Sequence, residues 1–420
     1  AHYSSRRPTL LTMSSIEIRQ ATLSNGLTIQ AEIVPGALTA AAGFFFRTGA
    51  RDEESTHMGV SHFLEHMMFK GTPQRTAEEV NQELDDLGAN HNAWTTAENT
   101  AYFVHTPHES ISSALDVIAD ILRPSLRPDD FAEEQQVILE EIAMYADQPF
   151  WVLYESALER YYTTNPLSHR VLGTVETVST MTPEVLRNYF DSRYSADNCV
   201  LAAAGRMDFD ALVHQAESLC SSWPSAQPKR VHHPMTFTPG EFEVELPEGT
   251  RQRYLLMLAP SVGTNDERRY AAGQVAHCLG DIEGSNFFWS LVETGLAEEA
   301  QLHFDGRDKC GEMAATVVCD VNNAEKVEEI VRNELKNAAD RISSDDLERS
   351  RAKIATAAML ASERPMGRMS RLGVRWSYGV PYRSLDEELE RINQINIDDI
   401  RSYLEEFPLD DLLVVRGGGK

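Results

Sequence analysis

The segment from His62 to His66 reads His-Phe-Leu-Glu-His, and its residue types and spacing are suited to metal chemistry. On an α-helix, side chains four positions apart lie on the same face, so His62 and His66 can donate ring nitrogens to one zinc ion. Glu65 projects beside that face, where its carboxylate can take a proton from water. Zinc lowers the pKa of bound water to about 7, so the motif predicts attack of water on a carbonyl group.

The alternative interpretation of this motif is a solvated, histidine-rich helix face. Apolar residues surround the motif, however, and a helix this apolar is expected to be buried (Phe63, Leu64, Met67, Met68 and Phe69). Buried histidine and glutamate side chains need partners, and a metal ion supplies one. With 13 histidines among 420 residues, a chance H-x-x-E-H match is expected only about 0.04 times in such a chain.

A third zinc ligand must come from another segment, because a catalytic zinc ion usually has three protein ligands. The helix expected from Asp130 to Tyr145 carries Glu133, Glu134, Glu140 and Glu141. Glu134 and Glu141 lie two helical turns apart on one face. Taken alone, this helix is more typical of an amphipathic helix with a solvated acidic stripe. Only its pairing with the histidine motif favours a role in metal binding.

The elements around these residues predict an α+β fold. Alternating or continuous apolar runs predict strands at 27–34, 40–47 and 102–105, and helical periodicity predicts helices at 58–69, 110–122 and 130–145. Thr76 and Glu79 form a capping-box pattern that starts a further helix. This mixed order fits antiparallel-rich sheets with helices packed on one face better than strict β-α-β alternation.

The chain divides into two similar halves. A proline-rich stretch, 221–240, interrupts the periodic pattern, so we predict domains at 14–220 and 241–420 with a linker between them. Residues 180–189 resemble residues 394–403, and each segment is followed by an apolar strand that ends in glycine. An apolar strand followed by an acidic loop also recurs near the start of each half. Three matches in the same order indicate a duplication and two similar α+β domains.

Composition excludes several classes of protein. The chain has 38 basic and 65 acidic residues, a net charge of −27, which disfavours binding to nucleic acid or anionic membranes and favours cationic peptides. No apolar run approaches the roughly 18 residues of a membrane span. Five scattered cysteines without a C-x-x-C pair support neither a disulfide framework nor a cysteine zinc site.

The N-terminal residues carry no apolar region typical of a signal peptide, because only Leu10 and Leu11 follow the arginines. We therefore expect a cytoplasmic protein. Met13 resembles a natural start, which would make residues 1–12 either an addition to the natural sequence or an alternative leader.

The segment from Gly59 to Thr72 closely resembles the zinc segment of the pitrilysin/insulinase metallopeptidases, the inverzincins. Their single-length bacterial members and the mitochondrial processing peptidase subunits are the most similar. The resemblance implies a zinc endopeptidase with one zinc ion per chain and a third ligand about 75 residues after the second histidine. Glu141 stands at that distance, and Glu134 stands where the family keeps a carboxylate that orients a zinc ligand.

Residues 88–102 resemble the edge strand of the same family's active site. The resemblance implies that Asn92 and Ala93 present backbone groups to a peptide substrate that adds to the sheet as an extra strand. It also implies that the two α+β halves form one side of a clam-shell chamber, which a second chain closes.

The second half differs from the first half in its metal ligands and from active family members in its oxyanion donors. A shift of the zinc residues by 214 positions leads to side chains that cannot bind metal (Ala276, Leu279, Gly280 and Ala355). Active family members carry here an arginine and a tyrosine that hold the substrate carbonyl and the developing oxyanion. The matching segment, 285–298, has no arginine, and Glu298 occupies the tyrosine position. Arg371 and Tyr378 have the right spacing in a segment that does not resemble the motif.

These observations predict a metalloendopeptidase that acts on peptides, with a preference for basic ones, or on unfolded segments. It would work as the metal-bearing subunit of a heterodimer whose partner supplies the arginine and tyrosine. A homodimer that uses Arg371 and Tyr378, or one of low activity, stays open. So does a non-catalytic structural subunit that resembles the core proteins of respiratory complexes. The complete set His62, Glu65, His66 and Glu141 favours the enzyme.

Overall fold

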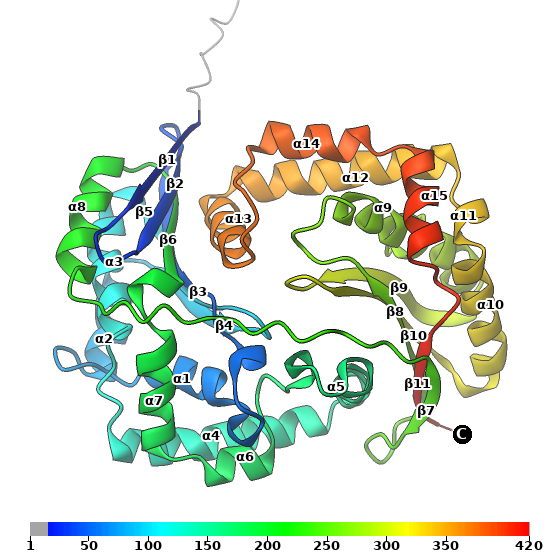
Figure 1. The fold of residues 1–420 in the computed structure, drawn as a ribbon, viewed down its shortest axis with the longest axis horizontal. Coiled ribbons are helices and arrows are strands. Elements are labelled where there is room, and N and C mark those ends of the chain that lie inside the picture. The colour runs from blue at the N-terminus through cyan, green and yellow to red at the C-terminus, as the bar shows by residue number, and fades with distance from the viewer. Residues whose placement is uncertain (1–15, 420) are drawn as a thin grey trace, which may run out of the picture.

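Two sheets of matching strand order form the framework of the protein, whose residues 16–419 are described in a computed structural model (Figure 1). The first sheet has the order β1 (Glu17–Thr22), β2 (Thr28–Ile33), β6 (Cys199–Gly205), β3 (Thr39–Phe46), β5 (Thr100–Pro107) and β4 (Asn90–Thr95). The second has the order β7 (Gly240–Val244), β11 (Leu413–Gly418), β8 (Gln252–Ser261), β10 (Gly311–Asp320) and β9 (Ala297–Gly306). The proposed start at Met13 lies outside the described residues.

The two sheets correspond strand by strand from β2 to β4 and from β7 to β9. The pairs β2–β6 and β7–β11 are parallel, and the other neighbouring strands are antiparallel. The expected fold class, two similar and antiparallel-rich α+β domains, is confirmed. The predicted strands at 27–34, 40–47 and 102–105 are β2, β3 and part of β5.

Helices surround both sheets. The first half contains α1 (Val60–Met68), α2 (Ala77–Asp86), α3 (Ile111–Ile121), α4 (Pro128–Ala146), α5 (Pro149–Tyr162), α6 (Val175–Thr180), α7 (Pro183–Arg193) and α8 (Phe209–Cys220). The second contains α9 (Arg269–Gly280), α10 (Ala324–Lys336), α11 (Ala338–Arg341), α12 (Ser344–Glu363), α13 (Pro365–Ser377), α14 (Leu385–Gln394) and α15 (Ile397–Glu406). The capping box at Thr76 is present, because its side chain accepts from the backbone of Glu79 and the Glu79 side chain accepts in return.

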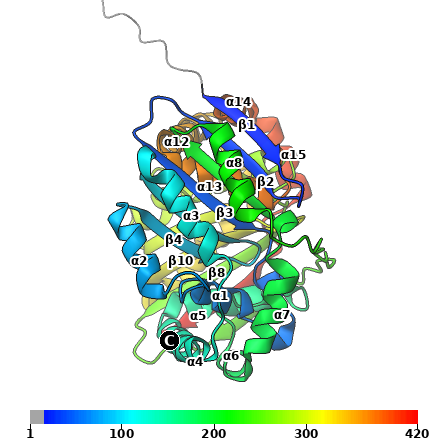
Figure 2. The same cartoon turned by 90° about the vertical axis from the view of Figure 1, so that its left-hand side faces the viewer.

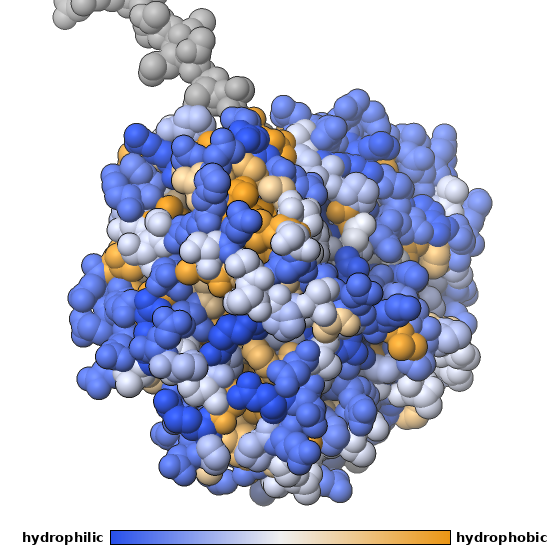
Figure 3. Space-filling model, turned by 60° about the vertical axis from the view of Figure 1, so that its left-hand side comes forward, coloured by the Kyte–Doolittle hydropathy of each residue, from blue (hydrophilic) through white to orange (hydrophobic). Residues whose placement is uncertain are grey.

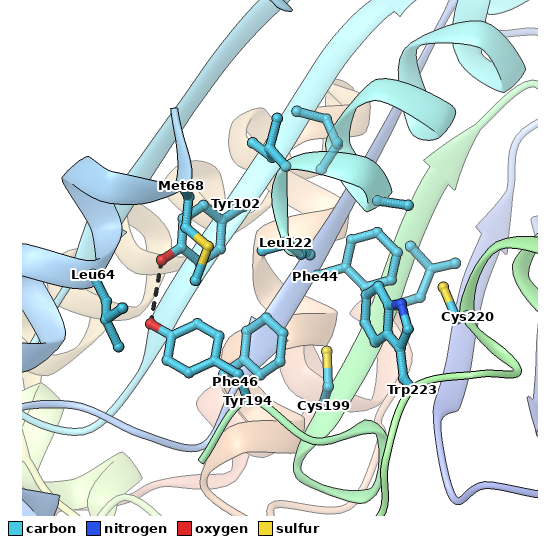
Figure 4. Packing of buried hydrophobic residues seen from close by; sticks show 14 of the residues in the cluster. Phe44, Phe46, Leu64, Met68, Tyr102, Leu122, Tyr194, Cys199, Cys220 and Trp223 are labelled. Carbon is cyan, nitrogen blue, oxygen red and sulfur yellow. Dashed lines mark hydrogen bonds between the residues drawn. The ribbon is translucent and has the colours of Figure 1, made fainter. Parts of the chain in front are cut away.

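The large core of the first half lies between the sheet and its own helices. Figure 2 shows α3 and α8 lying over the strands on that side. Alternate residues of β3 face this core, among them Phe44 and Phe46. Tyr102 and Tyr194 share a hydrogen bond of 3.2 Å between their hydroxyls (Figure 4). Because both hydroxyls are buried, this hydrogen bond helps to satisfy them.

The opposite face of each sheet is covered by a helix from the other half, an arrangement that the sequence pattern did not reveal. Met369 and Leu372 of α13 pack against β3, β5 and β6 through residues such as Phe45. In the second half, Leu153 and Tyr161 of α5 pack against β8 and β11. Strands buried on both faces have apolar side chains in both directions. This explains why β3 and β6 read as continuous apolar runs.

Residues 221–239 form neither helix nor strand and cross from one half to the other (Figure 1). Within residues 16–419, no helix is both long and apolar enough to cross a membrane. The face in Figure 3 is mostly hydrophilic, with apolar side chains scattered or in small groups.

Replacing Met369 with alanine tests the packing of α13 on the first sheet. Met369 is fully buried, so Met369→Ala should lower the free energy of unfolding by about 2–5 kcal/mol. Met359 on α12 is 44% exposed, and Met359→Ala should change it by no more than about 0.5 kcal/mol. Urea unfolding followed by circular dichroism measures both. Equal losses in the two variants would contradict the assigned packing.

Candidate metal centre

Helix α1 is fixed at its N-terminus by a buried carboxylate. Glu53 accepts hydrogen bonds from the backbone N–H groups of Gly59 and Ser61, both at 2.8 Å. The free N–H groups of a helix N-terminus need acceptors such as these oxygens. Burial raises the pKa of Glu53 to about 8, although the hydrogen bonds from Ser61 and Gly59 oppose the shift. Gly59 adopts a φ of +93°, and a Cβ there would lie 2.6 Å from the carbonyl oxygen of Leu172. Both features set where α1 begins.

The apolar side of α1 sets the orientation of the motif. Val60, Phe63, Leu64, Met67 and Met68 are buried in the first core. Phe63 stacks on Phe131 of α4, with ring centroids 4.7 Å apart and an angle of 16° between the rings. This contact places α4 beside α1, so that side chains of the two helices can meet.

The predicted ligands His62, His66 and Glu141 come together between α1 and α4. The Nε2 atoms of His62 and His66 lie 3.8 Å and 3.6 Å from Glu141 Oε2. In a tetrahedral zinc site with bonds of 2.0–2.1 Å, ligand atoms are about 3.4 Å apart. The three side chains therefore fit a zinc ion after movements of a few tenths of an ångström. Among the residues described, this is the only group of three or more such side chains that could hold a metal.

The pKa values of the two histidines shift in opposite directions. Burial, with a contribution from His66, lowers the pKa of His62 to about 3. His62 is therefore neutral, which is the form that binds metals. For His66, burial lowers the pKa, but the hydrogen bond and charge of Glu134 and the nearby carboxylates outweigh it and raise the pKa overall. The carboxylates thus make the centre attractive to a cation.

Glu134 lies within hydrogen-bond distance of His66, the ligand that the resemblance expects it to orient. His66 Nδ1 lies 2.8 Å from Glu134 Oε2, and Lys70 Nζ lies 2.5 Å from Glu134 Oε1. Burial raises the pKa of Glu134, but His66 and Lys70 outweigh it and hold the pKa below its usual value. An ionised Glu134 accepts a hydrogen bond from Nδ1–H of the neutral His66 ring, and this tautomer leaves the lone pair of Nε2 free toward Glu141.

Glu65 lies beside the ligands and is held by the neighbouring strand. Thr95 Oγ1 donates a hydrogen bond of 2.5 Å to Glu65 Oε2. Burial raises the pKa of Glu65, although Thr95 and His66 oppose the shift. A carboxylate whose pKa is raised toward neutral pH is a stronger base and therefore a better proton acceptor in catalysis.

Strand β4, which carries Asn92 and Ala93, forms one edge of the first sheet. It pairs with β5, and no strand within residues 16–419 pairs with its other side. The backbone N–H of Ala93 donates to the side chain of Asn92 at 2.8 Å rather than to a second strand. An extended peptide can add to such an edge.

Within this chain, neither Arg371 nor Tyr378 lies at the metal centre, so in the homodimer alternative the second copy would have to present them. Arg371 is paired with Glu32 of β2, at the far side of the sheet from β4. Tyr378 is largely buried and faces Glu98, and burial is the main cause of its raised pKa. Glu298, which occupies the position of the family's tyrosine, accepts a hydrogen bond of 2.6 Å from Gln252.

Three residues at the centre had no role assigned from sequence. In the sequence, Glu53 was part of an acidic loop. Lys70 and Thr95 lay in the two segments that resemble the family, 59–72 and 88–102, without a predicted role. Lys70 and Thr95 act through partners distant in the chain, and Glu53 acts through backbone N–H groups six and eight residues further on. No helical or strand periodicity signals such contacts.

Comparison with known proteins identifies the family. Residues 29–175 match the family described as Insulinase (Peptidase family M16), and residues 180–354 match the one described as Peptidase M16 inactive domain. An uncharacterized zinc protease of Streptomyces coelicolor is 30% identical over 92% of this chain and 86% of its own length. One of Bacillus subtilis is 27% identical over 94% and 96%. The chain belongs to the insulinase family, M16.

Solved structures share the fold. A protease from Helicobacter pylori superimposes with a TM-score of 0.89 at 17% identity, over 96% of this chain and all of that one. A chain of complex III2 from Candida albicans superimposes with a TM-score of 0.82 at 18% identity, over 96% of each chain. At such identities the likeness concerns the fold alone.

Replacing Glu134 tests its role in orienting His66. Glu134→Gln should weaken zinc binding by about 10- to 100-fold, the usual effect of losing a partner of a metal ligand. The neighbouring Glu133, whose side chain is 68% exposed, offers a matched control, and Glu133→Gln should bind zinc as the unmodified protein does. Competition with a chromogenic zinc chelator measures both affinities. Similar affinities in the two variants would exclude the orienting role.

Proposed function

We propose that this protein is a zinc-dependent endopeptidase with one zinc ion per chain, held by His62, His66 and Glu141. The observation that carries the proposal is the convergence of these three side chains within 4.8 Å of one another, with Glu65 beside them. Relatives named as uncharacterized zinc proteases support it.

Each side chain has a distinct task in peptide hydrolysis. When bound, zinc acidifies a water molecule and polarises the substrate carbonyl. Glu65 accepts the proton of the attacking water, and Thr95 keeps its carboxylate in place. Glu134 holds His66 in the tautomer that directs Nε2 to the metal. Mutation of Glu65 should therefore remove a catalytic base without removing a ligand.

The proposed substrates are peptides or unfolded segments that enter an enclosed chamber in extended form. Pairing with the free edge of β4 at Asn92 and Ala93 would align a peptide backbone beside α1. The net charge of −27 favours basic peptides, which the acidic surface would attract over a distance set by the ionic strength.

We further propose that the chain is the metal-bearing subunit of a heterodimer. The transition state of peptide hydrolysis needs donors for its oxyanion. The segment 285–298 contains no arginine, and Arg371 is engaged by Glu32. A second family member that lacks the zinc motif would supply the arginine and tyrosine across the chamber.

Metal analysis and one substitution test the enzymatic function. The purified protein should contain close to one equivalent of zinc per chain, which a chelator removes. Glu65→Gln should keep the zinc but lower kcat by about 10²- to 10⁴-fold, because it removes the base. His62→Ala should lose zinc as well as activity.

The second candidate function is a non-catalytic subunit, which the absence of an arginine from the segment 285–298 favours. These measurements distinguish it from the peptidase. Absence of zinc from protein purified in zinc-containing buffer would exclude the peptidase. Cleavage at the unmodified rate by Glu65→Gln would give Glu65 another role.

Reconstitution tests the heterodimer. The chain alone should cleave peptides slowly, and addition of a family member that lacks H-x-x-E-H should raise the rate by about 10²-fold or more, the contribution of an oxyanion donor. Mixing the same partner with His62→Ala should restore nothing, since this chain holds the metal. Robust cleavage by the single chain would refute the split site.

A further inference from the structure

Glu98, a buried carboxylate in the turn between β4 and β5, has no role in the hydrolysis proposed above. Its side chain is 1% exposed, although a charged residue in a hairpin turn is normally solvated. A buried carboxylate persists only where charges and hydrogen bonds compensate for the loss of water. The groups that do so here come from three separate parts of the chain.

The partners of Glu98 join the two halves and the linker. Arg51, which follows β3, forms a buried ion pair with its carboxylate. In the second half, the backbone N–H of Asp308 donates to both carboxylate oxygens, at 3.0 Å and 3.2 Å. Arg230 of the linker donates to the carbonyl oxygen of Glu98 at 2.5 Å and to both oxygens of Asp52.

The turn itself is also held through its backbone. The N–H groups of Ala50 and Arg51 donate to the carbonyl oxygens of Thr96 and Ala97, at 3.2 Å and 2.8 Å. A Cβ on Gly49 would lie 2.3 Å from Thr96 O, so the two loops approach closely. Glu98 is thus the point at which the second half and the linker contact the end of β4.

The end of β4 is also the part of the strand that meets the catalytic base. Thr95, the last residue of β4, bonds Glu65 and lies three positions before Glu98. Because β4 has a partner strand on one side only, its position depends on β5 and on the anchoring of this turn. The same strand carries Asn92 and Ala93.

We propose that Glu98 is a positioning residue, through which the second half and the linker hold β4 and Thr95 against Glu65. Its catalytic consequence rests on the proposed peptidase function, whereas the anchoring of β4 does not. Among the described residues, the second half contributes no side chain to the candidate metal group, yet it contributes to the site through the backbone of Asp308.

Glu32 provides a matched control. It is a buried carboxylate that also joins the two halves, through Arg368 and Arg371 of α13. It lies on β2, however, and three strands separate β2 from β4. Glu98→Gln and Glu32→Gln each leave buried arginines with a neutral partner, so both should destabilise the protein. Only Glu98→Gln should affect the catalytic strand.

Two measurements on the full-length protein test the proposal. By hydrogen–deuterium exchange with mass spectrometry, amides of residues 90–100 should exchange at least about tenfold faster in Glu98→Gln, and at the unmodified rate in Glu32→Gln. In peptide cleavage, Glu98→Gln should raise KM and lower kcat/KM by about 10- to 100-fold with unchanged zinc content. A loss of folded protein alone would leave KM unchanged. Glu32→Gln should keep both constants.

The outcomes distinguish the inference from the proposed function. An unmodified protein without peptidase activity would refute the function, and the exchange measurement would still decide whether Glu98 anchors β4. Equal exchange and equal KM in Glu98→Gln and Glu32→Gln would overturn the inference. If Glu98→Gln does not fold, Glu98→Asp replaces it, because aspartate keeps the charge but is one methylene too short to hold Arg51 and the Asp308 amide together. Unchanged exchange and KM in Glu98→Asp would then overturn it.

Discussion

Burial of the first sheet on both faces is the constraint on which the rest of the structure depends. Strand β3 directs Phe44 and Phe46 into the core formed with its own helices and Phe45 toward α13 of the other half. Helix α5 of the first half covers a face of the second sheet in the same way. Because each half covers a face that the other cannot cover for itself, apolar burial holds the two together. The relative position of the sheets follows from this exchange.

The metal centre depends on that framework through α1 and α4. Stacking of Phe63 on Phe131 brings the two helices side by side, and Glu53 fixes the start of α1. Burial keeps His62 neutral, while Glu134 and Lys70 control the charge around His66. The apolar surroundings strengthen each of these interactions, because water competes weakly in a buried site. Packing and electrostatics therefore act together on the same few side chains.

Duplication has left the two halves with the same architecture and different chemistry. The second half repeats the strand order of the first, yet the described residues contain one candidate metal group, in the first half. Sheet order and helix packing need only the apolar pattern, so the second half could keep its fold without the ligands. Its helix α13 and the turn at Asp308 still support the first sheet. The first half therefore still depends on the second for packing and hydrogen bonds, although the candidate metal group lies wholly in the first half.

The sequence alone determined the α+β class, the duplication, and the motif His62, Glu65 and His66, because periodicity and helical spacing are local properties. Family resemblance added Glu141 and Glu134, which residue spacing by itself left ambiguous with a solvated acidic stripe. Only the tertiary structure decided which sheet α13 covers, that Thr95 meets Glu65, and that Glu98 is buried rather than solvated. An apolar stripe shows that a helix face is buried, but not which surface buries it. That choice depends on contacts between residues far apart in the chain.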